Sequence, residues 1–371
     1  GTLVHALDFD DTHAGGLVHA TAIVLPAAFA VGQERGRTGG EVLDATVVGL
    51  EVACRVSAAA PHQFHARGLH ATMVAGVFSS AAVAARLMGL SPAQTTAALG
   101  IAGSQAGGLL AFLATGASTK QLHPGLASQS GILAARLAAA GASGPESVFD
   151  GPHGVFDALA GSQADPASIV VDLGTRWESE RIGIKPYPVC QLSHATLDAV
   201  AAARRARPFG PGDVARIEAD VHPDSAPTVC DDTRDLATPA SAYAAKFSLP
   251  WCVAALLVDG TLGLDAFEPG RLARREVAAL ASRVTWRLTD GAGHAADAAG
   301  HVRITLLDGT VVEGEVARSG GGPDNPLTRD QVRAKAIDNG GPAAEAVADL
   351  VERLADLDSV EPVLDATRTT P

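Results

Sequence analysis

The stretch A-A-R-L-M-G-L-S-P-A-Q-T-T-A-A-L-G at residues 84–100 decides the fold class of this chain. It joins the end of one alanine-rich apolar run, which we expect to form a helix from Thr72 to Met88, to the start of another. In S-P-A-Q, Ser91 can cap the second helix, proline suits the first turn and glutamine can complete a capping box. Similar runs, separated by glycine, proline and serine, extend from residue 40 to about residue 174 and predict a mainly helical domain.

Composition indicates a core of small side chains. Hydrophobic residues make up 47% of the 371 residues but aromatic residues only 4%, and much of the apolar content is alanine. Helices must therefore pack closely through small residues. The net charge of −13, with no clustered basic run, predicts that nucleic acid is not a partner. The longest near-apolar run, residues 247–258, is far shorter than the roughly 20 residues that cross a bilayer, so we expect no membrane partner.

Cysteine spacing limits the chemistry further. The four cysteines are widely separated along the chain: Cys54, Cys190, Cys230 and Cys252. None belongs to a C-x-x-C pair or to a spacing that holds zinc or an iron–sulfur cluster. We therefore expect no metal, no cofactor and a reducing, cytoplasmic location.

The character of the sequence changes after Lys185, where short runs that favour β-strands begin. These runs are residues 216–222, 283–289, 301–307 and 310–317. The last two flank Asp308-Gly309, which is a strong hairpin signal. T-R-D-Q at residues 328–331 is a second capping box and predicts a return to helix towards residue 357, with a break at G-G-P, residues 340–342.

These patterns predict a mainly α protein, with a large all-α domain built from both chain ends and a smaller inserted α+β lid domain. We place the helical domain at residues 1–181, the lid at 182–322 and the return to the helical domain at 323–371. The crossover segments 174–190 and 318–328 would form a hinge. Clefts between domains favour ligand sites, so the site is expected there.

The first candidate site is H-A-L-D-F-D-D-T-H at residues 5–13, continued by His19. Three carboxylates within four residues repel one another, which raises the pKa of at least one if it is buried, and nearby histidines can share protons. A solvated acidic turn or a helix cap would give the same spacing. Metal binding is a third possibility, if the carboxylates converge in space.

Two further candidates lie in the helical region. In R-G-L-H-A-T, His70 precedes a long helix, whose dipole disfavours the cationic imidazole and leaves it neutral and basic. In S-T-K-Q-L-H-P-G, Lys120 and His123 lie in an expected turn from Ser118 to Gly125, where they could hold a substrate carboxylate. An ordinary helix entry and a surface loop are the respective alternatives.

The fourth candidate is K-P-Y-P-V-C at the expected hinge, where two prolines stiffen the chain around Lys185, Tyr187 and Cys190. Its alternative is a structural crossover whose lysine faces water. Only four of the 28 basic residues are lysines, so each lysine in this arginine-rich chain merits attention.

Taken in order, six segments resemble the MmgE/PrpD family, which includes 2-methylcitrate dehydratases, cis-aconitate decarboxylases and iminodisuccinate epimerases. They are H-A-L-D-F-D-D-T-H, R-G-L-H-A-T, the stretch from A-A-R-L-M-G to S-Q-A-G-G-L at residues 84–109, K-Q-L-H-P-G, K-P-Y-P-V-C-Q-L-S-H-A-T-L-D-A and G-G-P-D-N-P-L-T. The resemblance covers essentially the whole chain. It implies a homodimer with a polar site between a helical domain and a lid.

The resemblance also implies site residues by position. The catalytic set is His70, Asp8, His19 and Lys185, and the substrate-binding set is Thr12, Lys120, His123, Tyr187, Cys190 and Trp251. Cys190 and Trp251 stand where the decarboxylase branch has a histidine and a tyrosine, which makes decarboxylation less expected. Family members carry extra helical sequence before the acidic segment, so we expect this chain to lack the family's first helices.

The leading hypothesis is a cofactor-independent hydro-lyase, similar to 2-methylcitrate dehydratase, that removes an α-proton and a β-hydroxyl from a small polycarboxylate. Lys120 and Lys185 would bind substrate carboxylates. His70 would act as the base, and Asp8 would orient His19 or share its proton. The alternatives are an epimerase of an amino- or imino-dicarboxylate, a cis-aconitate decarboxylase-like lyase and a non-catalytic dimeric relic.

Overall fold

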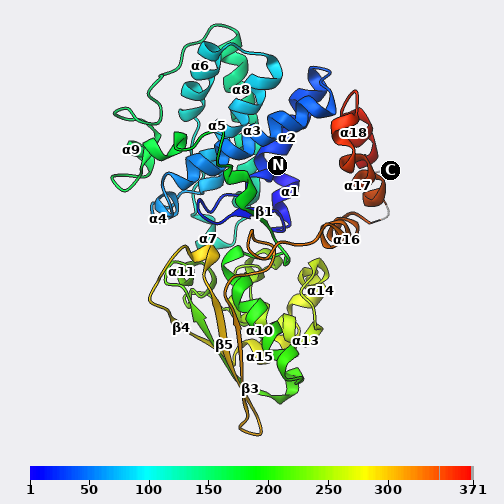
Figure 1. Cartoon of the computed structure of the whole chain (residues 1–371). Coiled ribbons are helices and arrows are strands. Elements are labelled where there is room, and N and C mark those ends of the chain that lie inside the picture. The colour runs from blue at the N-terminus through cyan, green and yellow to red at the C-terminus, as the bar shows by residue number, and fades with distance from the viewer. Residues whose placement is uncertain (342, 369–371) are drawn as a thin grey trace.

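The computed structural model describes residues 1–341 and 343–368. Figure 1 shows helices gathered at one end and a small sheet with its own helices at the other. The last helices return beside the first ones, so both chain ends build the helical part. The mainly α class with a smaller α+β part is confirmed.

The helical part is formed by most of the first half of the chain and by the C-terminal segment. Its helices are α1 (Thr2–Ala6), α2 (Thr21–Glu34), α3 (Gly39–Ala58), α4 (Gln63–Ala66), α5 (Ala71–Met88), α6 (Pro92–Gly103), α7 (Phe112–Thr115), α8 (Thr119–Ala139), α9 (Val155–Leu159), α16 (Arg329–Gly340), α17 (Ala343–Glu352) and α18 (Glu361–Thr367). A two-stranded sheet pairs β1 (Asp11–His13) antiparallel with β2 (Ile182–Ile184). This pairing ties the first candidate segment to the expected hinge.

Helix α5 is the centre of the helical part, packed against α2, α3, α6 and α8. Small residues permit the close contacts, since a side chain on Gly76 would meet Ala127 and one on Gly131 would meet the backbone of Val77 and Ala81. Among the described helices, α5 is the one long and apolar enough to span a membrane, but 83% of it is buried within the protein, as in the core helix of a soluble fold. The expected core of closely packed small residues is confirmed.

Most predictions that we made from local signals at helix ends are confirmed. Ser91 and Gln94 form the capping box of α6, and Thr328 and Gln331 form that of α16. The predicted helix from Thr72 to Met88 corresponds to α5. Helix α16 ends at Gly340 and α17 begins at Ala343, while Pro342 lies outside the described residues.

Two local predictions are wrong. The segment 118–125 is not a turn, because α8 begins at Thr119 and continues through Pro124. Burial of α8 against α5 outweighs the local preference of proline, and it places Lys120 and His123 three residues apart on one helix face. The helical pattern expected up to Gly174 ends at Ala139, and mainly irregular chain with the short α9 follows where glycine and proline are frequent.

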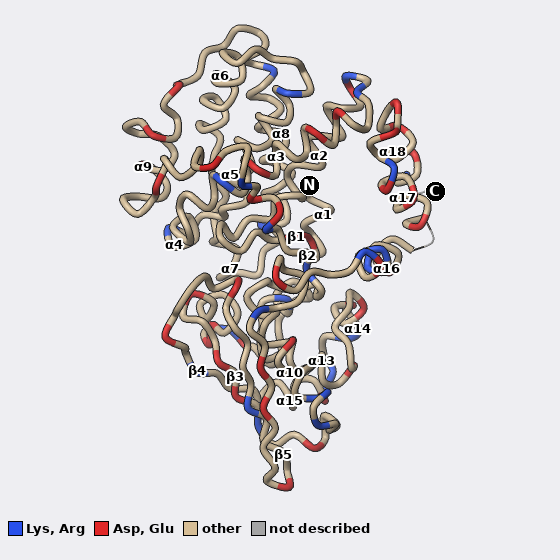
Figure 2. Tube along the Cα trace, in the orientation of Figure 1, with Lys and Arg blue, Asp and Glu red and all other residues tan. Residues whose placement is uncertain are grey.

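The α+β part contains a four-stranded sheet in the order β4-β3-β5-β6. Its elements are α10 (His194–Ala206), β3 (Val214–Val221), α11 (Ala226–Val229), α12 (Ala242–Ala245), α13 (Leu249–Asp259), α14 (Pro269–Leu272), α15 (Arg275–Ala281), β4 (Val284–Leu288), β5 (Gly300–Leu306) and β6 (Val311–Val316). Strands β5 and β6 form the hairpin predicted around Asp308-Gly309, and Gly309 has the positive φ of 83° that such a turn favours. Strand β4 runs parallel to β3, and the other pairs are antiparallel. Figure 2 shows acidic and basic residues mixed along these strands.

Glycine 314 of β6 sets how closely α10 lies on the sheet, and its replacement tests this packing. A Cβ atom there would lie 2.0 Å from the carbonyl oxygen of Ala199 in α10, which cannot move without shifting the helix. Gly314→Ala should lower the free energy of unfolding by about 1–3 kcal/mol, the usual cost of overpacking, as measured by urea denaturation. The control Gly212→Ala places its Cβ in open space and should change stability by no more than about 0.5 kcal/mol. Equal effects of the two substitutions would contradict the assigned contact.

Candidate active site

The acidic segment between α1 and β1 holds a buried ion pair. Lys185 Nζ lies 2.6 Å from Asp8 Oδ1, and Lys120 Nζ lies 3.5 Å from the same oxygen. Asp8 and Lys185 have fully buried side chains. Burial alone would raise the pKa of Asp8, but the ammonium groups of Lys120 and Lys185 hold it well below its ordinary value. Asp8 is therefore a carboxylate, fixed between two lysines that come from distant parts of the sequence.

The remaining two lysines hold the backbone of the same segment. Lys246 Nζ donates to Leu7 O at 2.6 Å, and Lys335 Nζ donates to Phe9 O at 2.7 Å. All four lysines of the chain thus converge on residues 7–9. A lysine ammonium is a compact charge with three donors, whereas guanidinium is a broad planar fork, so arginine is a poor substitute at such close contacts. This convergence explains why an arginine-rich chain retains these lysines.

Five histidines gather beside this segment. The ring centroid of His70 lies 5.2 Å from that of His123, 5.6 Å from that of His5, 6.0 Å from that of His19 and 6.1 Å from that of His65. His70 occupies the position directly before α5, and its backbone amide donates to Gly108 O at 2.7 Å. The structure therefore brings together histidines from α1, α4, α5, α8 and the loop before α2.

Hydrogen bonds hold four of these five rings, those of His5, His19, His70 and His123, through Nδ1. His70 Nδ1 lies 3.1 Å from His123 Nδ1, so one of the two rings donates to the other. His19 Nδ1 bonds Asp11 O at 2.8 Å and lies 3.2 Å from Thr12 Oγ1. His19 and His70 also line the cavity, so the second nitrogen of each of these two rings can face a substrate.

The histidines that line or support the cavity are neutral near pH 7. Burial lowers the pKa of His19 and of His70 well below the ordinary value, and the charge of Lys120 adds to the shift of His70. Burial also lowers the pKa of His123 to about 4 and that of His65 to about 3. A neutral imidazole carries a free electron pair, so these residues can accept protons.

A cavity opens onto this cluster between the two parts of the molecule. Its polar wall includes Asp8, His19, His70 and Lys120, while Phe112, Phe247 and leucines form an apolar wall. Cys190 lines it too, and burial raises the pKa of its thiol, so the thiol is protonated. Charged, neutral polar and apolar side chains thus meet in one cavity, as they do in small-molecule sites.

Some predicted site residues lie outside this cavity. Three of them do not line the cavity, but each contacts a residue that does. Lys185 contacts Asp8, Thr12 contacts His19 and His123 contacts His70. Tyr187 donates to Asp198 at 2.7 Å at the edge of the lid core, and Trp251 is fully buried in that core against Phe267. The structure does not bring Tyr187 and Trp251 to the cavity, and their contact with a substrate stays a prediction.

Three residues of the cluster were not among the predicted site residues. His5 Nδ1 donates to Asp10 Oδ2 at 2.5 Å, and both side chains are fully buried. His65 lines the cavity. The close spacing of His5, Asp8 and Asp10 in one short segment could have identified His5 and Asp10 as site residues. No pattern in the sequence around His65 distinguishes that residue. By contrast Asp11 accepts from the Thr21 amide at the start of α2, and His13 bonds Glu178, which are structural contacts.

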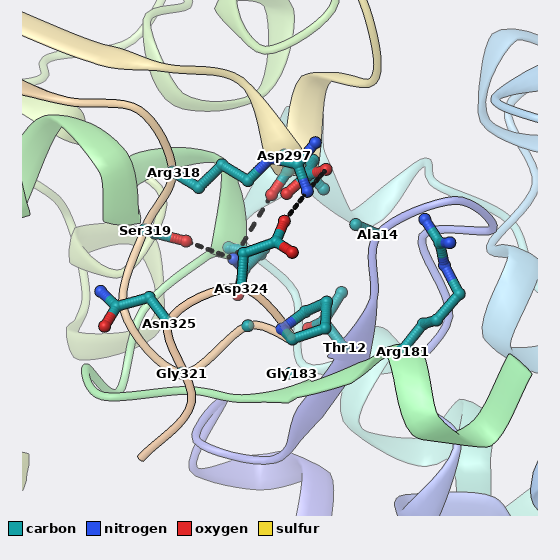
Figure 3. A pocket seen from close by; sticks show the side chains of 14 residues that line it. Thr12, Ala14, Arg181, Gly183, Asp297, Arg318, Ser319, Gly321, Asp324 and Asn325 are labelled. Atoms are coloured by element: carbon teal, nitrogen blue, oxygen red, sulfur yellow. Dashed lines mark hydrogen bonds and ion pairs between the residues drawn. The ribbon is translucent and has the colours of Figure 1, made fainter.

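A second, polar pocket lies where the crossover segments meet (Figure 3). Arg318 pairs with Asp297 at 3.2 Å and also with Asp324, which closes one side of it. Thr12 reaches it from β1. Gln191 lines both this pocket and the histidine cavity, so the candidate site adjoins the junction between the helical part and the lid.

Sequence comparisons agree with this architecture. The model of the MmgE/PrpD N-terminal domain matches residues 1–167, and that of the MmgE/PrpD C-terminal domain matches residues 187–360. The chain belongs to the MmgE/PrpD family. The resemblance seen in the sequence is therefore confirmed.

Curated relatives within this family carry related names. The chain is 30% identical to the cis-aconitate decarboxylase-like protein oryM of Aspergillus oryzae, over 90% of this chain and 73% of the relative. It is 28% identical to the cis-aconitate decarboxylase of Aspergillus terreus, over 98% of this chain and 78% of the relative. The human cis-aconitate decarboxylase is 30% identical over 76% of this chain and 59% of the relative. Decarboxylases of this kind are lyases, so a lyase-type role is supported for this member of the family.

Proposed function

We propose that this MmgE/PrpD protein is a hydro-lyase that dehydrates a small hydroxy-polycarboxylate, as 2-methylcitrate dehydratases do. The observation that carries the proposal is the neutral, buried His70 beside Lys120 in one cavity. An ammonium group can bind a substrate carboxylate and stabilise the negative charge that develops on it when the α-proton leaves. A neutral imidazole can accept that proton.

In this proposal each group has a defined task. His70 removes the α-proton, and the electron pair of the C–H bond forms the new double bond as the β-hydroxyl leaves. The hydroxyl takes a proton from solvent and departs as water, because His19 is neutral and has no acidic proton to give. Asp8 acts through the lysines, because its closest contacts are Lys185 and Lys120. The reaction consumes no redox equivalent, and the proton on His70 returns to solvent.

Decarboxylation is the second candidate, and the names of the relatives favour it. The bond that breaks is then C–C, carbon dioxide leaves, and the remaining carbon skeleton gains a proton. The neutral state of the histidines favours proton removal over proton donation as the first step. The decarboxylase branch carries a histidine at the position of Cys190, so the cavity wall of this protein has one acid–base group fewer. We therefore rank dehydration first.

Proton NMR in deuterated water distinguishes these reactions. We expect incubation with 2-methylcitrate or citrate to produce an alkene signal as the hydroxylated substrate disappears. Conversion of cis-aconitate to a smaller unsaturated dicarboxylate would establish decarboxylation instead. Deuterium entering an amino- or imino-dicarboxylate without alkene formation would indicate epimerisation, and thermal stabilisation by polycarboxylates without turnover would indicate a relic.

We further propose a homodimer in the cytoplasm. Four leucines on α8 are between 41% and 47% exposed, at a helical spacing that places them along one stripe: Leu122, Leu126, Leu133 and Leu137. Such an apolar stripe supports burial against a second copy. The four cysteines are unpaired, which agrees with a reducing compartment. Light scattering during size-exclusion chromatography measures the oligomeric state.

A further inference from the structure

We propose that His5, His19 and His70 form a binding site for one zinc ion, which would block the cavity. One ring nitrogen from each residue lies within 4.8 Å of those of the other two. The three residues are 0%, 6% and 1% exposed, so the set lies inside the protein rather than on a mobile surface. A set of three imidazoles suits zinc and other late divalent metals, with a fourth position left for water.

The hydrogen bonds of the three rings match those of metal-binding histidines. Each Nδ1 is already held, that of His5 by Asp10 Oδ2 at 2.5 Å, that of His19 by Asp11 O at 2.8 Å and that of His70 by His123 at 3.1 Å. Outer partners of this kind, carboxylates and backbone carbonyls above all, orient imidazole ligands and leave Nε2 for the metal. His5 Nε2 is buried without any hydrogen-bond partner, which is unfavourable unless something binds it.

Charge near the site is compatible with a dication. One carboxylate oxygen of Asp8 and one of Asp10 are also buried without a hydrogen-bond partner. The low pKa values of both groups keep them ionised. Their two negative charges offset the repulsion from Lys120 and Lys185, and the uncharged rings require no proton release before they bind metal.

The rings must approach one another slightly. Zinc bonds imidazole nitrogen at about 2.0–2.1 Å in a tetrahedral site, which places ligand nitrogens roughly 3.4 Å apart. The separations of up to 4.8 Å therefore have to shrink by about 1.4 Å or less. His19 and His70 line the cavity, so their rings border open space that leaves room for such an adjustment.

A zinc ion in this position would occupy the electron pair of His70. Zinc binding and proton acceptance by His70 would therefore be mutually exclusive, and a chelator should relieve the block. The site stands on its own geometry, however, and zinc binding is measured without a substrate. Failure of the proposed dehydration would leave the zinc inference intact.

The test is zinc binding to tag-free, chelator-treated whole protein, followed by competition with a chromophoric zinc chelator. We expect one zinc ion per chain. Asp10→Asn, which removes the carboxylate behind His5, should weaken binding about 10- to 100-fold. His5→Gln and His19→Gln should weaken it at least as much. His65→Gln is the matched control, since His65 is a buried neighbour outside the three proposed ligands, and it should bind zinc as the wild type does.

Cobalt gives a second measurement that needs no variant. Co²⁺ added to the wild-type protein should show the intense visible absorption of a four-coordinate ion, and zinc should abolish it. Absence of stoichiometric zinc binding by the wild type would overturn the proposal. Equal zinc affinities of folded His5→Gln, His19→Gln and His65→Gln proteins, or a six-coordinate cobalt spectrum, would also overturn it.

Discussion

Replacing His70 by alanine should lower turnover by about 100-fold or more, the usual contribution of a positioned general base. His70 is 1% exposed, lines the cavity and pairs with His123, and burial lowers its pKa well below 6.5. It is therefore unprotonated, and competent as a base, across the neutral pH range. The loss should appear in kcat, because His70 forms no ion pair that would anchor a substrate carboxylate.

The His70→Ala substitution should affect the chemical step and leave the fold intact. The backbone amide of His70, which bonds Gly108 O, is unchanged in the alanine variant, so the start of α5 should persist. His294→Ala is the control, since His294 is exposed in the lid and should leave turnover unchanged. Steady-state kinetics on the substrate that NMR identifies measures both. A turnover within about twofold of the wild type would remove His70 from the role of base.

Much of the fold was predictable because its signals are local. The capping box at Ser91, the Asp308-Gly309 hairpin and the helix start at Thr328 depend on side chains that bond backbone a few residues away. The turn expected around Pro124 was wrong because the decisive interaction is not local. Helix α8 is buried against α5 along its length, and sequence spacing contains no record of that contact.

The candidate site was predictable only in pieces. Each histidine and lysine had an ordinary local alternative, and what distinguishes them is convergence from separate segments. The low lysine content was the one global clue, and the lysines that it singled out converge around Asp8 in the structure. His65 could not be found, because its proximity to His70 results from a short helix, α4, that turns the chain back before α5. Family resemblance gave the order of the segments and implied a site role for Trp251, which lies in the lid core and not on the cavity, so that role stays a prediction.

The largest stability effect should come from Lys185→Met. Lys185 is fully buried, and its ammonium donates to Asp8 Oδ1 at 2.6 Å and to Asp8 O at 3.1 Å. Methionine fills similar volume but leaves the buried Asp8 carboxylate with Lys120, 3.5 Å away, as its one remaining lysine ion pair. Breaking a buried pair by removing one partner costs about 3–5 kcal/mol, so the free energy of unfolding should fall by about that amount in urea denaturation.

A double-mutant cycle separates the charge effect from lost packing. Asp8→Asn removes the carboxylate that Lys185→Met leaves unpaired, so the double variant should be more stable than the sum of the two single losses predicts, by about 1–3 kcal/mol. The sign of this coupling energy distinguishes the two causes. Packing defects at neighbouring positions would give additive or larger losses of stability, whereas the double variant no longer contains the unpaired Asp8 charge. Additive losses would show that Lys185 acts by filling space, and Lys120 would then be the sole partner that keeps Asp8 ionised.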